Sequence, residues 1–130
     1  MDIKDYSIKK YRIRPEAMKL IKYLNWKETS QKEEEDKFFL DKIVNTYFSQ
    51  ILAGQILMQK EKISGRKDRS LLLKNDTHQL IDKKHSKAKC TMGEAIEFSL
   101  FIYAQENLTS EELKMNDLNA WNITYRRVRK

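Results

Sequence analysis

The sequence has very little cysteine, proline and glycine: its 130 residues include one, one and three of them, respectively. The lone cysteine, Cys90, cannot form a disulfide within the chain, which excludes the disulfide-stapled class of small secreted proteins. The scarcity of glycine and proline argues against a β-sandwich or barrel, since these folds need many tight turns. We therefore expect a mainly helical protein in a reducing compartment, the cytoplasm.

Long hydrophobic runs and catalytic motifs are also missing from the sequence. No apolar stretch reaches the roughly 18 residues of a membrane-spanning helix, and no secretion signal is found. His78, His85 and Cys90 follow no standard zinc spacing, and no glycine-rich phosphate loop or activated nucleophile is present. We expect no membrane partner, no metal or other cofactor, and no enzymatic activity.

Positive charge is plentiful and unevenly spread. The 26 lysines and arginines outnumber the 19 acidic residues, which gives a net charge of +7. Residues 27–36 are acidic, whereas 60–89 and 122–130 are rich in lysine and arginine. This distribution suits a polyanionic partner such as nucleic acid. The alternative is a basic, soluble protein whose charges are only solvated.

The chain contains an internal repeat, in which YRIRPEAMKLI at 11–21 is echoed by LLLKNDTHQLI at 71–81. Each stretch passes from alternating apolar and polar residues into a helix-start signal and then into a helical apolar pattern. The sequence therefore predicts two copies of a strand–helix–helix unit.

The first unit is predicted to open with a strand over 6–14 whose inward face carries Tyr11 and Ile13. Proline then favours a helix start, and the apolar spacing predicts a helix over about 15–26. The strongest helical periodicity follows, and it predicts a long core helix over about 32–60, opened by a Ser-x-x-Glu capping box.

The second unit is predicted to begin after a loop, with a strand over 69–74 and a helix over about 77–86. Thr91 then has the form of a capping residue at the start of another helix. A last short helix is expected over 110–119. The chain ends as a basic strand or a loose tail.

The order of these elements resembles the ribbon-helix-helix family of DNA-binding proteins, the Arc and methionine-repressor type. The matching stretches are 10–24, 70–81 and 90–104. The resemblance implies that the two strands pair antiparallel and that their outward side chains enter the major groove of DNA. It also implies that the N-terminus of each unit's second helix binds a phosphate.

The expected fold class is therefore mainly α with a short two-stranded antiparallel ribbon, in a tandem ribbon-helix-helix arrangement. The two units would span 1–62 and 63–108, and residues 109–130 would add a helix and a basic tail, all within one compact domain. Tandem versions of this kind resemble plasmid-transfer accessory proteins. The first unit departs from the family pattern, because its linker between helices is about seven residues longer and is acidic.

The outward face of the two predicted strands supplies the candidates for reading bases: Lys10, Arg12, Arg14, Ser70, Leu72 and Lys74. Arginine can bond guanine O6 and N7 together, and a leucine can touch a thymine methyl group. The candidates for binding phosphates lie at a helix start and in the tail: Thr91, Gly93, Arg126, Arg127, Arg129 and Lys130. The structural alternatives are an edge-protecting charged strand, an ordinary helix cap and a solvated tail.

These observations predict a sequence-specific protein for double-stranded DNA, acting as a transcriptional repressor or as a plasmid or phage partition or transfer accessory factor. The ribbon could close within one chain or across a homodimer. The rival is a helical adaptor or inhibitor that engages a protein through the apolar helix 38–58. A third reading keeps DNA binding but uses a helix-turn-helix over 77–104.

Overall fold

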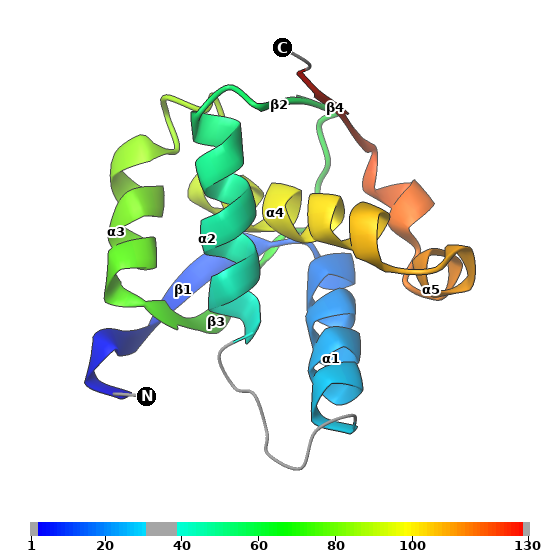
Figure 1. Ribbon diagram of the computed structural model, residues 1–130, viewed down its shortest axis with the longest axis horizontal. Coiled ribbons are helices and arrows are strands. Elements are labelled where there is room, and N and C mark those ends of the chain that lie inside the picture. The colour runs from blue at the N-terminus through cyan, green and yellow to red at the C-terminus, as the bar shows by residue number, and fades with distance from the viewer. Residues whose placement is uncertain (1–2, 31–38, 129–130) are drawn as a thin grey trace.

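The computed structural model describes residues 3–30 and 39–128. Its helices are α1 (Pro15–Ser30), α2 (Phe39–Leu52), α3 (Asn75–Lys84), α4 (Met92–Asn107) and α5 (Ser110–Met115). Its strands are β1 (Tyr6–Ile13), β2 (Ile56–Lys60), β3 (Lys67–Lys74) and β4 (Ile123–Arg127). Two short 3-10 helices, η1 (Ile3–Asp5) and η2 (Leu118–Trp121), precede β1 and β4 (Figure 1).

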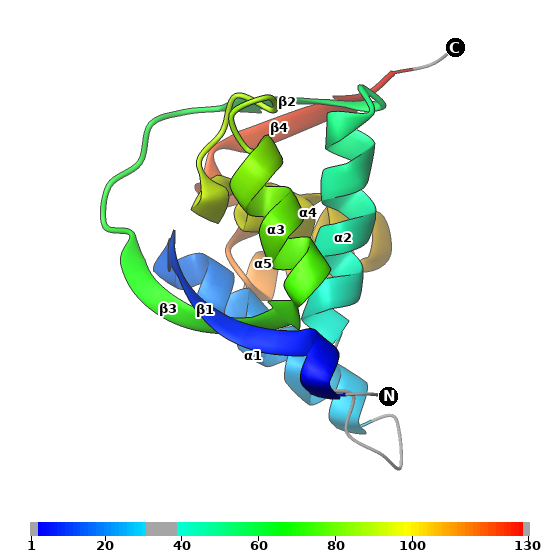
Figure 2. The same cartoon turned by 90° about the vertical axis from the view of Figure 1, so that its left-hand side faces the viewer.

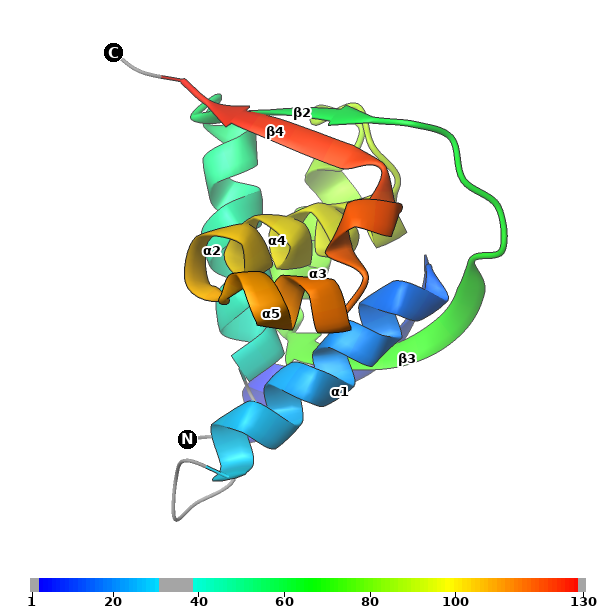
Figure 3. The ribbon, with the colours of Figure 1, turned by 90° about the vertical axis from the view of Figure 1, so that its right-hand side faces the viewer.

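The four strands form two separate antiparallel ribbons. β1 pairs with β3, and β2 pairs with β4. The views in Figure 2 and Figure 3 place the two ribbons at opposite ends of the molecule, and helices α2, α3 and α4 lie between them. Each ribbon thus covers its own end of the helical layer.

The second ribbon overturns the expected fold class. A tandem ribbon-helix-helix chain with one ribbon is wrong, because β2 and β4 make a second sheet; the sequence predicted helix at 56–60 and left the C-terminal end as a basic strand or a loose tail. The long helix predicted over 32–60 ends at Leu52, and Gly54 then takes a left-handed φ of +76°. Residues 56–60 are free to extend beyond this glycine, and β4 supplies the partner strand that they need.

Other boundaries differ less from those expected. β3 begins at Lys67 within the predicted loop, and α1 continues to Ser30. The capping residue expected at Thr91 is confirmed, and Thr109 forms a second capping box; each hydroxyl accepts a backbone N–H from the glutamate three residues on. The capping box expected at Ser30 and Glu33, and the acidic run 33–36, include residues outside those that the structure describes.

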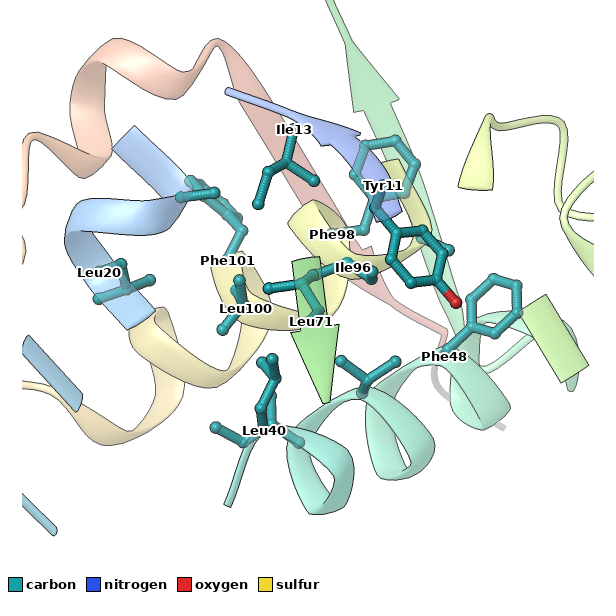
Figure 4. Packing of buried hydrophobic residues seen from close by; sticks show 14 of the residues in the cluster. Tyr11, Ile13, Leu20, Leu40, Phe48, Leu71, Ile96, Phe98, Leu100 and Phe101 are labelled. Carbon is teal, nitrogen blue, oxygen red and sulfur yellow. The ribbon is translucent and has the colours of Figure 1, made fainter. Parts of the chain in front are cut away.

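The core is organised around α4 rather than α2. Every residue from Gly93 to Ile102 is buried, because α4 packs against α2 on one side and against β1 on another. Figure 4 shows side chains of the β1–β3 ribbon, Tyr11 of β1 and Leu71 of β3 among them, packing against α4 and α2. A helix that is buried all round lacks a strong amphipathic stripe, which explains why the sequence pattern ranked α2 first. Among the described helices, none combines the length and apolarity needed to cross a membrane.

Candidate nucleic-acid interface

The β1–β3 ribbon has one buried face and one exposed face. Alternation along the strands turns Tyr11, Ile13, Leu71 and Leu73 into the core, where each is at most 4% exposed. The register places the opposite residues of the two strands side by side on the other face. We call this surface the outer ribbon face; it comprises Tyr6, Ile8, Lys10 and Arg12 of β1 with Lys74, Leu72, Ser70 and Asp68 of β3. Tyr6, at one end of this face, is itself buried.

Polar and basic groups of the outer ribbon face are well placed to meet a ligand. Lys10 lies directly opposite Ser70, and both are exposed. Lys74 is exposed at one end of the face, with its ammonium 6.0 Å from the centre of the Tyr6 ring. Lysines in these positions can bond phosphate oxygens or the acceptor edges of bases.

Arg12 is exposed but already has partners. Its Nη1 lies 3.8 Å from Asp68 Oδ1, and its Nη2 donates to the backbone oxygen of Arg66 at 3.2 Å. The two side chains of the ion pair are 71% and 60% exposed, so water screens their attraction. Arg12 is therefore oriented along the face and can exchange Asp68 for a stronger acceptor.

Arg14 was expected on the same face, and the structure corrects this placement. It is 2% exposed, and its Nη2 lies 3.1 Å from Oε1 of the fully buried Glu97 on α4. Its guanidinium also donates to the backbone oxygen of Trp121. The Cζ of Arg14 lies over the indole ring of Trp121, 5.1 Å from the ring centre. Arg14 follows the last strand residue, and the carboxylate of Glu97 draws its side chain inward, away from any base.

A second arginine completes this buried ionic cluster. Arg66, in the loop before β3, donates from Nε and Nη2 to the two oxygens of Glu97 at 3.0 and 2.9 Å. These hydrogen bonds raise the pKa of Arg66 above its ordinary value. Burial of the neighbouring Glu94 by itself would raise the pKa of that carboxyl. Hydrogen bonds from Lys60 and from the backbone of Thr91 have a larger effect, so the pKa of Glu94 is lowered. Through Glu97, the cluster connects the loop at Arg66 and the end of β1 to α4.

The helix start at Thr91 and Gly93 does not offer the expected phosphate site. Thr91 is exposed, but its backbone N–H already donates to Glu94 Oε1 at 2.9 Å. A carboxylate at this point repels a phosphate. Gly93 is buried, and a Cβ built on it would lie 1.8 Å from the backbone oxygen of Arg12. The glycine serves close packing of α4 on β1 rather than anion binding.

The basic tail is divided between a strand and undescribed residues. Arg126 is exposed on β4, directly opposite Leu57 of β2. Arg127 donates twice to the carboxylate of Glu106, at 2.6 Å from both Nε and Nη2. Arg129 and Lys130 lie outside the described residues. Arg126 and Arg127 belong to the ribbon at the other end of the molecule, so these two arginines cannot extend the outer ribbon face.

Three members of the outer ribbon face were not among the predicted candidates: Tyr6, Ile8 and Asp68. Tyr6 and Ile8 share the strand parity of Lys10, but only the charged residues of that parity were named as candidates. Asp68 was assigned to a loop because its strand begins earlier than expected. Following the alternation to the start of the first predicted strand, and one residue before the second, would have found all three residues.

Other candidate sites are weaker. A hollow of about 860 Å³ opens between β2, β4, α4 and η2, and its lining mixes polar side chains such as Gln59 and Gln105 with apolar ones such as Phe101. Within residues 3–30 and 39–128, no three His, Cys, Asp or Glu side chains are grouped so as to hold a metal ion. Comparisons of this chain with protein-family models, with curated proteins and with solved structures find no match. Its function therefore has to be inferred from the site itself.

Proposed function

We propose that this protein binds double-stranded DNA by placing the outer ribbon face in the major groove. The observation that carries the proposal is an exposed two-stranded antiparallel ribbon whose face presents Lys10, Arg12 and Lys74 beside polar Ser70. A two-stranded ribbon fits the width of the major groove, where each base pair displays a distinct set of donors and acceptors. Arg12 and Lys10 are the proposed readers of bases, and Lys74 binds a base or a phosphate.

The ribbon is closed within one chain, which bears on the stoichiometry. β1 and β3 come from the two halves of the same molecule, and their inner faces share one core. A homodimer is not required to complete the outer ribbon face. A monomer can thus bind one site, as a repressor or as a partition or transfer accessory factor would, and dimers would add a second site by symmetry.

Two observations favour the outer ribbon face over the two competing hypotheses. The adaptor hypothesis needs an exposed apolar helix over 38–58, but α2 ends at Leu52 and buries Leu40, Val44 and Phe48 in the core. The helix-turn-helix hypothesis needs α3 and α4 to present a recognition helix. α4 is buried along most of its length, so it cannot enter a groove.

A titration of fluorescent random-sequence duplex DNA tests the proposal. We expect binding at about 50 mM salt that weakens steeply by about 200 mM, because bound phosphates release counterions. Arg12→Ala should weaken binding to a selected target by about 1–3 kcal/mol and relax its specificity. Lys114→Ala removes a positive charge on α5, distant from the outer ribbon face in Figure 1, and serves as the control. Absence of binding at low salt, or equal effects of the two variants, would overturn the proposal.

A further inference from the structure

An apolar pair interrupts the charged surface of the outer ribbon face. Ile8 is 70% exposed, which exceeds the exposure of the other large exposed hydrophobic residues described, Trp26 at 61% among them. The register sets it directly opposite Leu72, which is half-buried. Side chains at directly opposed positions of an antiparallel pair touch each other. Ile8 and Leu72 therefore form one continuous apolar spot.

The surroundings of the spot indicate its partner. Lys10 and Ser70 form the next pair on one side, and Tyr6 with Lys74 forms the next pair on the other. Two side chains are far too little for a stable protein interface, which buries on the order of 800 Å² on each partner. Covering the pair with an apolar group of matching size is favourable, at about 25 cal/mol per Å² of apolar surface buried.

The major groove offers one apolar group of this size. Thymine carries a 5-methyl group on its major-groove edge, whereas the guanine and adenine edges present polar atoms there. A ribbon that enters the groove brings the apolar pair to the level of the base edges, while Lys10 and Lys74 reach acceptors on either side. Burying the apolar pair against a thymine methyl group then contributes favourable binding free energy.

On the basis of the proposed DNA binding, we propose that Ile8 and Leu72 select thymine by contacting its methyl group. The target then carries A·T pairs beneath the Ile8–Leu72 pair. It carries acceptor-rich steps under the basic side chains next to it. Ile8 and Leu72 act as specificity residues beside the proposed base readers Arg12 and Lys10, and Lys74 adds a contact to a base or a phosphate.

Removing only the methyl groups from the DNA tests this proposal. Alternating dA–dT and dA–dU duplexes of equal length display the same hydrogen-bonding groups and differ by the 5-methyl group. At one salt concentration, the parent protein should prefer the dA–dT duplex by about fourfold for each methyl group buried, and about fifteenfold for two. Ile8→Ala should reduce this preference about fourfold, because Leu72 alone then contacts a methyl group, and it should weaken binding to the dA–dT duplex more than binding to the dA–dU duplex.

Leu57→Ala is the matched control. Leu57 is an exposed apolar strand residue, 46% exposed, on the ribbon at the opposite end of the molecule (Figure 3). The Leu57→Ala variant should keep the full preference for dA–dT. Circular dichroism of each variant checks that the ribbon is intact.

The remaining outcomes separate this proposal from the one on which it rests. Equal affinity of the parent for the two duplexes overturns thymine selection but leaves DNA binding standing. Failure to bind either duplex at low salt overturns DNA binding itself. If Ile8→Ala weakens both duplexes equally, or converts a dimer into a monomer in light scattering, the apolar spot serves packing or self-association, and thymine selection is again overturned.

Discussion

Arg14 and Glu97 form an ion pair in which both charges are buried: Arg14 Nη2 lies 3.1 Å from Glu97 Oε1, and the two side chains are 3% and 0% exposed. The backbone N–H of Arg14 also donates to Glu97 Oε2 at 2.9 Å. The pair connects the end of β1 to α4, and Arg66 extends it to the loop that leads into β3. Both strands of the outer ribbon face are thus attached to one buried carboxylate.

Replacing this carboxylate should destabilise the fold. Glu97→Gln leaves the buried charge of Arg14 without its counter-charge, so we expect the free energy of unfolding to fall by about 3–5 kcal/mol. Urea denaturation followed by circular dichroism measures the change. The control Glu111→Gln, at an exposed position on α5, should shift the free energy of unfolding by less than about 0.5 kcal/mol. Similar values for both variants would show that the buried pair contributes little.

A methyl group at Gly93 should force α4 away from β1. The Cβ of Gly93→Ala would lie 1.8 Å from a backbone oxygen, which cannot move as a flexible side chain can. We expect a loss of about 3 kcal/mol in urea unfolding. Gly54→Ala provides a comparison, because nothing lies within 4 Å there and only its φ of +76° is unfavourable; about 1 kcal/mol is expected. An equal loss at both glycines would refute the close packing of α4 on β1.

Removing the acidic residue of the outer ribbon face should tighten DNA binding. Asp68 lies 3.8 Å from Arg12 and repels phosphates, so Asp68→Asn frees the arginine and removes the repulsion. Because the pair is exposed, the gain should be modest, about 0.5–1 kcal/mol in fluorescence titration. Glu111→Gln makes the same change of net charge away from the ribbon. Asp68→Asn should strengthen binding more than this control does, and weaker binding would count against the ribbon as the DNA interface.

The stability of the α1–α5 contact should depend on pH. Lys27 donates to Glu112 at 2.8 Å, and this bond together with that from Tyr23 lowers the pKa of Glu112 to about 2. Because the folded-state pKa is depressed, the stabilisation is present above the unfolded value near 4.3 and is lost as pH falls towards 2. Glu112→Gln keeps an acceptor for the helix cap but loses the charge.

Urea unfolding at several pH values compares the two proteins. The parent should be more stable than Glu112→Gln at pH 7, and the difference should shrink between about pH 4 and pH 2. A difference that stays constant across this range would show that the charge of Glu112 contributes nothing.

The thiol of Cys90 should be unreactive in the folded protein. Cys90 is 8% exposed, and burial raises the pKa of its thiol to about 11. At pH 8 about one thiol in a thousand is then ionised, and only the thiolate is nucleophilic. We expect a disulfide reagent to modify the native protein at least about a hundred times more slowly than free cysteine, and to modify unfolded protein at the ordinary rate. Rapid modification of the native protein would contradict the burial of this turn.

Local sequence patterns determined several parts of this protein. Alternation at Tyr11, Ile13, Leu71 and Leu73 identified the strands and their inner face, since burial of one face of a strand leaves a period of two. The hydroxyl–glutamate spacing at Thr91 identified a helix start, because the capping box joins two residues three positions apart in the chain. Such features involve neighbours in the chain, so the sequence alone can specify them.

The tertiary structure decided the features that depend on distant partners. Residues 56–60 fit a helix or a strand by their own pattern, and only pairing with Ile123–Arg127, over sixty residues later, made them a strand. Arg14 has the parity of an exposed residue, but Glu97 on α4 draws it into the interior. A β-ladder and a buried charge both need a partner whose position is set by packing, and local periodicity carries no information about that partner.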